Sequence, residues 1–361
     1  MTPPKTSAPK VSVVIPVYNR ERYIGQAIDS ILSQSFRDFE LIVVDDGSSD
    51  GTPAVVERCR DPRVRLVRHE TNQGIPQTRN RGLREARGEY VAWLDSDDVA
   101  LPQRLRVQVD VLDRSPGIAL LGSWAGTVND EARWLPRYKV LPTEPEEVGA
   151  RLLLRCPILQ YSMMGRAEVL KDFGYREDFP VCQDFDLFVR LFARHALANV
   201  PRLLVRRRFH PGRVTREKSA LVKAMNLRIV AAQLEALGVD ATPEDLDRHF
   251  MLPRLNQQGA PSDPTFVEWT ADWCQRLVDA NAARPVYEPR ALRRTLGRVW
   301  LEACFYMLPG APGAVLRCLG RSPLRHWAGA GTARYLRVLL TRPLPSGGAD
   351  PDAWRTRGAH G

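Results

Sequence analysis

Three carboxylates, those of Asp95, Asp97 and Asp98, follow directly on the apolar residues 91–94. Like charges this close repel one another, and burying them costs several kcal/mol unless a positive group neutralises them. Carboxylate oxygens are the ligands that Mg²⁺ and Mn²⁺ prefer, and such an ion commonly holds a substrate diphosphate. We therefore expect Asp97 to bind a divalent metal that bridges two phosphates, and Asp95 to reach the ribose of a nucleotide. Asp98 is expected to cap the helix that leads into 101–105.

Strands and helices that alternate between residues 10 and 105 are expected to position these groups. Runs rich in β-branched residues predict buried strands, and apolar residues three or four apart predict amphipathic helices. The strands are expected within 10–20, 39–46, 63–70 and 88–95, and the helices within 21–36, 52–60 and 74–87. Such alternation is typical of a parallel α/β sheet with helices on both faces, in which ligands bind beyond the carboxyl ends of the strands.

Polar residues end three of these strands: Tyr18-Asn19, Asp45-Asp46 and Asp95-Ser96-Asp97. Because the carboxyl ends of parallel strands meet at one edge of a sheet, the three clusters are expected to converge there. At that edge Asp46 could accept a hydrogen bond from a nucleotide base, and the ring of Tyr18 could contact the same base. Taken alone, the Asp-Ser-Asp-Asp run could equally be a solvated turn or a helix cap, since Asp is common in both. The convergence favours a binding site.

Two long stretches, together with three shorter ones, carry a resemblance to a known family. The long ones read VSVVIPVYNRERYIGQAIDSILSQSFRDFELIVVDDGSSDGT (11–52) and NQGIPQTRNRGLREARGEYVAWLDSDD (72–98). The shorter ones read YSMMGRAEVLKDFGY (161–175), CQDFDLFVRL (182–191) and RRRFHPGRVT (206–215). In order and spacing these segments resemble family 2 glycosyltransferases of the GT-A fold, and the resemblance covers residues 10–215.

For the donor side, the resemblance implies a set of residues around a nucleotide-sugar. They are Pro16, Tyr18, Asn19, Glu21, Asp46, Arg79, Asp95 and Ser96. The first three match the opening motif that frames the nucleoside, Asp46 matches the acid that contacts the base, and Arg79 matches a residue that lines the nucleotide site. Asp97 matches the metal ligand of the family's Asp-x-Asp motif.

For the acceptor side, the resemblance implies that Asp184 is the catalytic base. Many members have Glu-Asp where this chain has Gln183-Asp184, so Gln183 is expected to do no more than bond the acceptor. Asp184 could instead be the N-cap of the following helix, while Asp186 is expected to be a cap or first-turn acid. Arg208 and His210 match a distal motif near the diphosphate, where His210 would add a metal ligand. The alternative for His210 is an ordinary turn histidine.

The expected fold class is α/β: a GT-A, Rossmann-like, mixed and mainly parallel sheet with helices on both faces, followed by a mainly helical C-terminal region. Four segments are expected: a disordered N-terminus (1–9), a catalytic domain (10–215, with a nucleotide-binding half 10–105 and an acceptor half 106–215), a basic helical region (216–340) and a disordered tail (341–361).

Charge is distributed unevenly along the chain. Residues 1–200 carry 27 Lys and Arg against 28 Asp and Glu, whereas residues 201–361 carry 25 against 14. A basic half indicates anionic partners, or simply a surface rich in arginine. The segment 297–327 mixes aromatic, leucine and arginine residues, so it could lie on an anionic membrane surface or pack as a helical bundle. Nucleic acid is not expected, since no recognised motif accompanies the arginines.

The six cysteines are scattered and form no CxxC pair, which favours reduced thiols in a cytoplasmic protein. No apolar stretch is long enough to span a membrane, and the first ten residues lack the apolar core of a secretory signal. The expected location is therefore the cytoplasm, with peripheral contact at the inner face of the cell membrane left open.

The expected function is metal-dependent, inverting sugar transfer from a nucleotide-diphosphate donor, a UDP-sugar first, to a hydroxyl of a glycan, glycolipid or polysaccharide. Asp184 would deprotonate that hydroxyl, and Mn²⁺ or Mg²⁺ would stabilise the departing diphosphate. One alternative is a catalytically inactive nucleotide-sugar-binding or scaffold protein. Another is a sugar-nucleotidyltransferase, which would need a Gly-rich basic loop after the first strand, and PVYNRERY (16–23) is not one.

Overall fold

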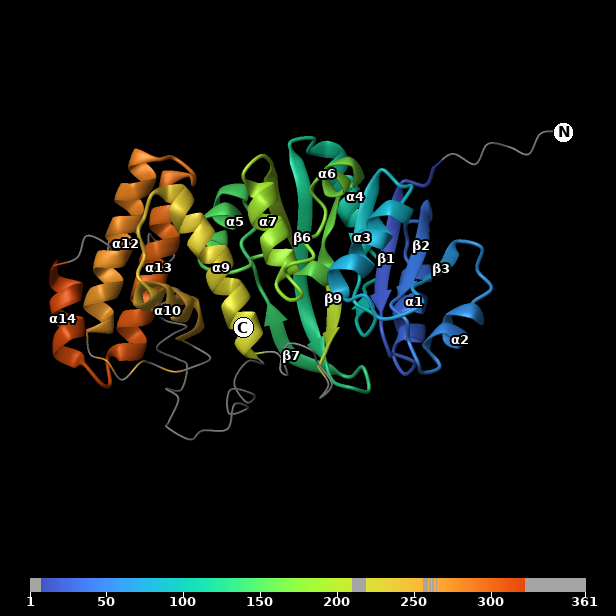
Figure 1. Ribbon diagram of the computed structural model, residues 1–361, viewed down its shortest axis with the longest axis horizontal. Coiled ribbons are helices and arrows are strands. Elements are labelled where there is room, and N and C mark those ends of the chain that lie inside the picture. Colours follow the sequence, from blue (N-terminus) through green and yellow to red (C-terminus); the bar gives the residue numbers. More distant parts are fainter. Residues whose placement is uncertain are drawn as a thin grey trace. The chain divides into compact units, whose positions relative to one another are not determined.

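The computed structural model describes residues 8–209, 219–255, 259, 261, 263 and 265–321 (Figure 1). The chain forms two compact units. The first comprises Met1–Val148 and Cys156–Met225, and the second comprises Gly149–Arg155 and Asn226–Gly361. The expected boundary between residues 215 and 216 lies outside the described residues and stays a prediction. The expected disorder of 1–9, of which only residues 8 and 9 are described, and of 341–361 also stays a prediction.

A nine-stranded mixed sheet forms the centre of the first unit, with strand order β3-β2-β1-β4-β8-β6-β9-β5 and β7 paired to β6. The strands are β1 (Val11–Val17), β2 (Phe39–Asp45), β3 (Val64–Arg68), β4 (Tyr90–Trp93), β5 (Val99–Ala100), β6 (Ile118–Val128), β7 (Trp134–Lys139), β8 (Met164–Arg166) and β9 (Ala196–Arg208). The pairs β1–β2, β1–β4, β2–β3 and β6–β9 are parallel. The predicted mixed α/β fold, mainly parallel in the half that carries the three polar clusters, is confirmed.

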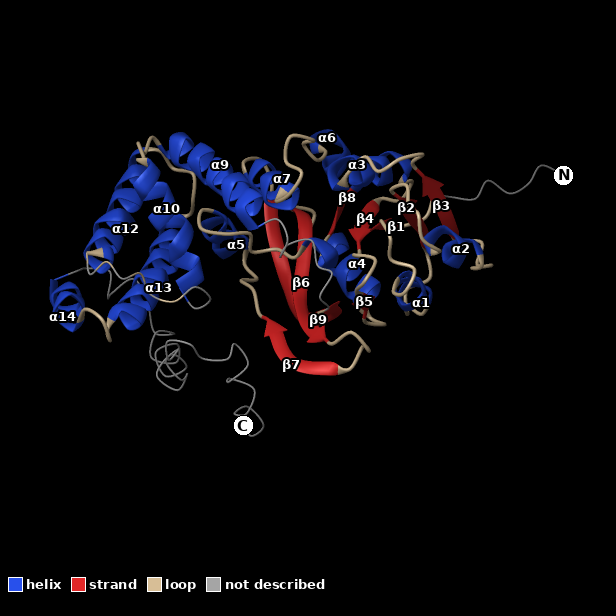
Figure 2. Cartoon of the chain, turned by 60° about the horizontal axis from the view of Figure 1, so that its bottom comes forward, coloured by secondary structure: helices blue, strands red, loops and turns tan. Residues whose placement is uncertain are grey.

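Helices cover this sheet, and the first three lie within the ranges that the apolar spacing predicts. They are α1 (Ile24–Leu32), α2 (Thr52–Glu57), α3 (Ile75–Glu85), α4 (Arg104–Arg114), α5 (Pro145–Leu152, shared between the two units), η1 (Gln160–Ser162), α6 (Ala167–Phe173) and α7 (Gln183–Phe192). Side chains of β1 alternate between two layers: Val13 and Ile15 share a buried cluster with α1, whereas Val14 faces α3. A Cβ on Gly82 of α3 would clash with Val14, so the glycine permits this close approach. Figure 2 shows α3 and α1 on opposite sides of these strands.

The second unit is helical in its described part. Its helices are α9 (Ser219–Leu237, which begins in the first unit), α10 (Pro243–Met251), η2 (Leu252–Arg254), α12 (Phe266–Ala283), α13 (Pro289–Met307) and α14 (Pro312–Arg321). Trp273 of α12 and Trp300 of α13 are buried in its core. The predicted helical C-terminal region is therefore confirmed. No helix of the described residues is both long and apolar enough to cross a membrane.

A buried histidine joins segments of the second unit through hydrogen bonds, and it makes the stability of that unit depend on pH. Nδ1 of His249 accepts a hydrogen bond from Nε1 of Trp273 (2.9 Å), so Nε2 carries the proton that bonds the Leu153 carbonyl (2.8 Å). Burial lowers the pKa of His249 from 6.5 to about 4.

We expect stability to fall as the pH drops from 6.5 towards 4, because the unfolded chain then binds a proton that the folded chain excludes. One such proton is worth about 1.4 kcal/mol per pH unit. Urea unfolding between pH 7 and pH 4 measures this slope, which should be smaller in His249→Gln and unchanged in the control His195→Gln. An unaltered slope in His249→Gln would show that other groups cause the acid sensitivity.

Candidate active site

The three polar clusters lie at the carboxyl ends of three adjacent strands. β1 pairs in parallel with both β2 and β4, so the residues that follow these strands share one edge of the sheet. The backbone N–H of Asp46 donates to the Val17 carbonyl (2.8 Å), and that of Leu94 donates to the Val14 carbonyl (3.2 Å). These bonds continue the sheet to its edge and fix where each cluster begins.

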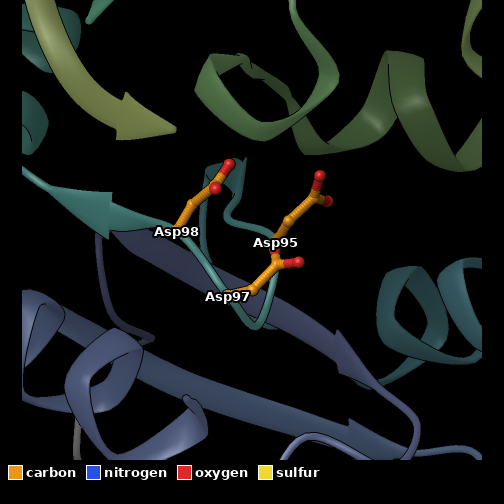
Figure 3. A group of neighbouring side chains, drawn as sticks. All are labelled: Asp95, Asp97 and Asp98. Carbon is orange, nitrogen blue, oxygen red and sulfur yellow. The ribbon is translucent and has the colours of Figure 1, made fainter. Parts of the chain in front are cut away.

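The acidic cluster occupies the turn between β4 and β5 (Figure 3). One oxygen from each of Asp95, Asp97 and Asp98 lies within 4.8 Å of the others. Burial raises the pKa of Asp95 to about 6, and the negative charges of Asp97 and Asp184 add to the effect. Burial and the two neighbouring carboxylates also raise the pKa of Asp98. Acids that are costly to ionise together, and that present hard oxygen ligands, fit a site for a divalent cation.

Asp98 does not cap a helix, and that expectation is wrong. Its side chain is buried, and Oδ1 accepts a hydrogen bond from the backbone N–H of Arg208 (2.9 Å). The residues after it, Val99 and Ala100, form β5 and pair with β9. The helix α4 begins later, with Gln103 at its N-cap position and no side-chain cap. Asp98 therefore ties the acidic turn to the end of β9.

Arg208 supports the acidic turn from behind. Its buried guanidinium donates from Nε to the Asp97 carbonyl (2.9 Å), from Nη1 to the Asp130 carbonyl (2.5 Å) and from Nη2 to Oε1 of Gln26 (2.6 Å). With all three nitrogens bonded to the protein, Arg208 holds the Asp97 backbone and is not free to face a diphosphate, which corrects that expectation. His210 lies outside the described residues.

The loops after β1 and β2 are built around the residues expected to contact the nucleoside. Pro16 lies within β1, opposite Val44, and Tyr18 is 44% exposed. Asn19 adopts φ 51°, where its backbone N–H donates to Oγ of Ser48 (2.9 Å) and its Oδ1 accepts from the backbone N–H of Ser49 (2.9 Å). Asn tolerates this left-handed conformation better than most residues. These bonds hold the loop that carries the exposed Tyr18 at the sheet edge.

Glu21 and Asp46 also fix these loops. Oε2 of Glu21 accepts from the backbone N–H of Gly51 (3.0 Å), just before α2. The buried Asp46 carboxylate accepts from the backbone N–H groups of Gln73 (2.8 Å) and Gly74 (2.9 Å), and it lies 2.9 Å from Nδ1 of His69. Asp46 therefore joins the end of β2 to the start of α3. His69 was not identified from the sequence as the partner of Asp46.

Arg79 of α3 borders the acidic cluster. Its side chain is 7% exposed, and Nη2 lies 3.5 Å from Oδ1 of Asp95. The guanidinium lies 5.9 Å from the ring centroid of Trp93 and 5.6 Å from that of Tyr175. Nε and Nη1 are buried without a hydrogen-bond partner. Unsatisfied buried donors are costly, so this cation is suited to receive an anionic or polar ligand.

Asp184 lies in the first turn of α7, near the acidic cluster. The preceding Cys182 takes the N-cap position with φ 58° and makes no side-chain capping bond. Oδ1 of Asp184 accepts from the backbone N–H of Phe185 (2.9 Å), and its charge contributes to the raised pKa of Asp95. Asp186, by contrast, is buried and bonded to Arg190 (2.8 Å).

Asp184 is thus the half-buried acid of this helix whose charge interacts with the acidic cluster. It lies inside the first turn of the helix and not at the N-cap position. Gln183 beside it is buried. The arrangement places a half-buried carboxylate near a set of acids that could hold a metal ion.

Two arginines near the cluster were missed from the sequence. Arg104 is fully buried, with Nη2 donating to the carbonyls of Trp93 (2.6 Å) and Met163 (3.2 Å), and burial lowers its pKa to about 9. Arg207, the neighbour of Arg208, is close enough for its charge to oppose the raised pKa of Asp95. Successive side chains of a strand point to opposite faces of the sheet, so a strand that includes both Arg207 and Arg208 would place their side chains on different faces. That alternation is the sequence signal that could have distinguished the roles of the two arginines.

Known proteins resemble this chain in sequence and in fold. The family model described as glycosyl transferase family 2 matches residues 12–177. A putative glycosyltransferase of Bacillus subtilis, EpsE, is 33% identical over 192 residues, which are 52% of this chain and 68% of the relative. The succinoglycan biosynthesis protein ExoO of Rhizobium meliloti is 44% identical over 114 residues, 31% of this chain and 33% of the relative.

A crystal structure of S. aureus TarS in complex with UDP-GlcNAc superposes with a TM-score of 0.55 at 20% identity, covering 87% of this chain and 92% of that one. This likeness concerns the fold. The chain spans about two thirds of EpsE and one third of ExoO.

Proposed function

Because the chain belongs to glycosyl transferase family 2 and is a glycosyltransferase, we propose that it moves a sugar from a nucleotide-diphosphate donor to an acceptor hydroxyl with inversion at the anomeric carbon. The observation that carries the proposal is the acidic cluster of Asp95, Asp97 and Asp98 beside Asp184. The donor proposed first is a UDP-sugar. The acceptor proposed is a growing polysaccharide or a related glycan or glycolipid, as suggested by the succinoglycan relative.

We assign Asp97 to hold Mn²⁺ or Mg²⁺, which when bound would offset the charge of the diphosphate, and Asp95 to contact the ribose of the nucleotide. Arg79 would place its unpaired Nε and Nη1 donors on the donor's polar groups. Asp184 would take the proton of the acceptor hydroxyl as that oxygen attacks the anomeric carbon. Inversion needs one displacement, so no protein nucleophile is required. Pro16, Tyr18, Asn19, Glu21, Asp46 and Ser96 would shape the nucleoside end of the pocket.

A release assay tests the proposed function. The protein is incubated with MnCl₂ and with UDP-, GDP- or dTDP-sugars, and the nucleoside diphosphate released is measured with and without candidate polysaccharide acceptors. We expect release from one donor class, faster with an acceptor and abolished by EDTA. Binding of that donor at 100 times its Kd should also stabilise the fold by about 2.7 kcal/mol. Failure of every donor both to bind and to turn over would refute the function.

Peripheral membrane contact through the basic 216–340 region is also a proposal, and the structure gives it little support. The residues of α13 with an apolar side chain are mostly buried inside the second unit, among them Val299, Trp300 and Ala303. Their burial favours the helical-bundle alternative. Sedimentation of the full chain with anionic vesicles tests this contact. Absence of the protein from the vesicle pellet would refute the proposed membrane contact.

A further inference from the structure

Successive arginines at the end of β9 point to opposite faces of the sheet. Arg206 has its guanidinium 5.5 Å from the ring centroid of Trp134, and Arg208 reaches Gln26 of α1. Arg207, between them, has its guanidinium 5.5 Å from the ring centroid of Tyr161 in η1. This alternation is the ordinary period of a strand. It turns Arg207 towards the acidic cluster and keeps its two neighbours on the other side.

Arg207 is a cation beside acids with which it forms no ion pair. Its charge opposes the raised pKa values of Asp95 and Asp98. Within the described ranges the structure gives it neither a hydrogen bond nor an ion pair, and its side chain is partly exposed. The hydroxyl of Tyr161 beneath it is buried and also lacks a partner.

Two other arginines near the cluster are enclosed by the protein, although Arg79 among them keeps unpaired Nε and Nη1 donors. Arg104 is enclosed and bonded to backbone carbonyls, and Arg79 is nearly buried at 3.5 Å from Asp95. Arg207 differs from both because its side chain is partly exposed and, within the described residues, its guanidinium makes no hydrogen bond or ion pair. A guanidinium with free donors is suited to phosphate oxygens, which it can bind through two parallel hydrogen bonds.

We propose that Arg207 binds the diphosphate of the nucleotide-sugar and stabilises the nucleoside diphosphate as it leaves, the task that the family resemblance implies for Arg208. This inference rests on the proposed function. In the transfer the bond between the anomeric carbon and the diphosphate oxygen breaks, its electron pair stays on that oxygen, and the acceptor oxygen forms the new bond. Arg207 offsets the negative charge that gathers on the leaving group.

The competing role for Arg207 is that of a simple counter-ion to the acids. The two roles predict opposite results when its charge is removed. A counter-ion lowers the affinity of the cluster for a cation, so its loss would tighten Mn²⁺ binding and leave nucleotide binding intact. A diphosphate ligand increases the affinity for nucleoside diphosphates, so its loss would weaken their binding.

Calorimetry of Arg207→Gln separates these roles, with Arg206→Gln as the matched control on the opposite face of the same strand. The probes are Mn²⁺ alone, UDP with saturating Mn²⁺, and uridine with saturating Mn²⁺, with GDP and guanosine replacing the last two if GDP binds the wild type more tightly. We expect Arg207→Gln to weaken diphosphate binding about 10- to 100-fold and to leave the nucleoside affinity unchanged. Arg206→Gln should change neither, and Arg207→Lys should recover part of the loss.

Equal diphosphate affinity in Arg207→Gln and the wild type would overturn the inference while leaving the proposed function standing. An equal loss of nucleoside and diphosphate affinity would also overturn it, because that pattern indicates a distorted pocket. If the wild type binds no nucleoside diphosphate at all, the proposed function fails and the inference falls with it.

Discussion

Replacing Asp184 by asparagine is expected to lower sugar transfer about 100- to 10,000-fold while leaving donor binding intact. Asparagine keeps the size of the side chain but cannot accept the proton of the acceptor hydroxyl. The loss should therefore appear in kcat, with little change in the Kd of the nucleoside diphosphate. Transfer kinetics and calorimetry on the same preparation measure the two quantities.

Asp186→Asn on the same helix is the contrasting variant. It removes the carboxylate that bonds Arg190, so it should lower the thermal stability by leaving this partly buried cation without its acidic partner. Asp184→Asn should unfold at nearly the wild-type temperature, since its side chain is half-buried and its hydrogen bond joins adjacent residues. Turnover of Asp184→Asn at the wild-type rate would reject Asp184 as the base.

Replacing Asp97 by asparagine is expected to reduce Mn²⁺ affinity and to lower transfer at least about 1,000-fold at moderate Mn²⁺ concentration. A metal at a departing diphosphate contributes several kcal/mol, and each 1.4 kcal/mol is a factor of ten in rate. Raising the Mn²⁺ concentration should recover part of the rate, because the neighbouring acids still supply oxygen ligands.

The exposed Glu57 of α2 provides the control, as Glu57→Gln removes one negative charge at a position outside the cluster. It should leave Mn²⁺ affinity and transfer unchanged. If Asp97→Asn and Glu57→Gln behaved alike, the cluster would have no part in metal binding, and the role of Asp97 would have to be given up.

The local sequence pattern was sufficient to predict the strands and helices of the parallel half of the sheet. The expected strand ranges contain β1 to β4, and the expected helix within 21–36 contains α1. These elements are recognisable because buried parallel strands are continuous runs of β-branched residues and a surface helix repeats its apolar residues every 3.6 positions. The edge position of Asp46 and of the acidic turn then follows from the chain direction alone.

Contacts between segments that are distant in the chain could not be predicted from the local sequence pattern. The role of Asp98 depends on Val99 pairing with Arg206, more than a hundred residues away in the chain. The same pairing decides that Arg208 is enclosed against α1 and that Arg207 turns to the acids. Sequence pattern shows that the two arginines alternate, but it does not show which layer each of them meets. The contact of Asp46 with His69 could not be predicted from the sequence for the same reason.

The most direct test of the central claim is anomalous diffraction at the manganese edge from crystals grown with MnCl₂ and UDP, or with GDP if that nucleotide binds more tightly. The account predicts a manganese peak in direct contact with the carboxylate of Asp97, with the diphosphate on the ion and the ring of the base beside Tyr18. Nucleotide bound elsewhere on the chain, or a manganese peak that avoids Asp95 and Asp97 altogether, would contradict it.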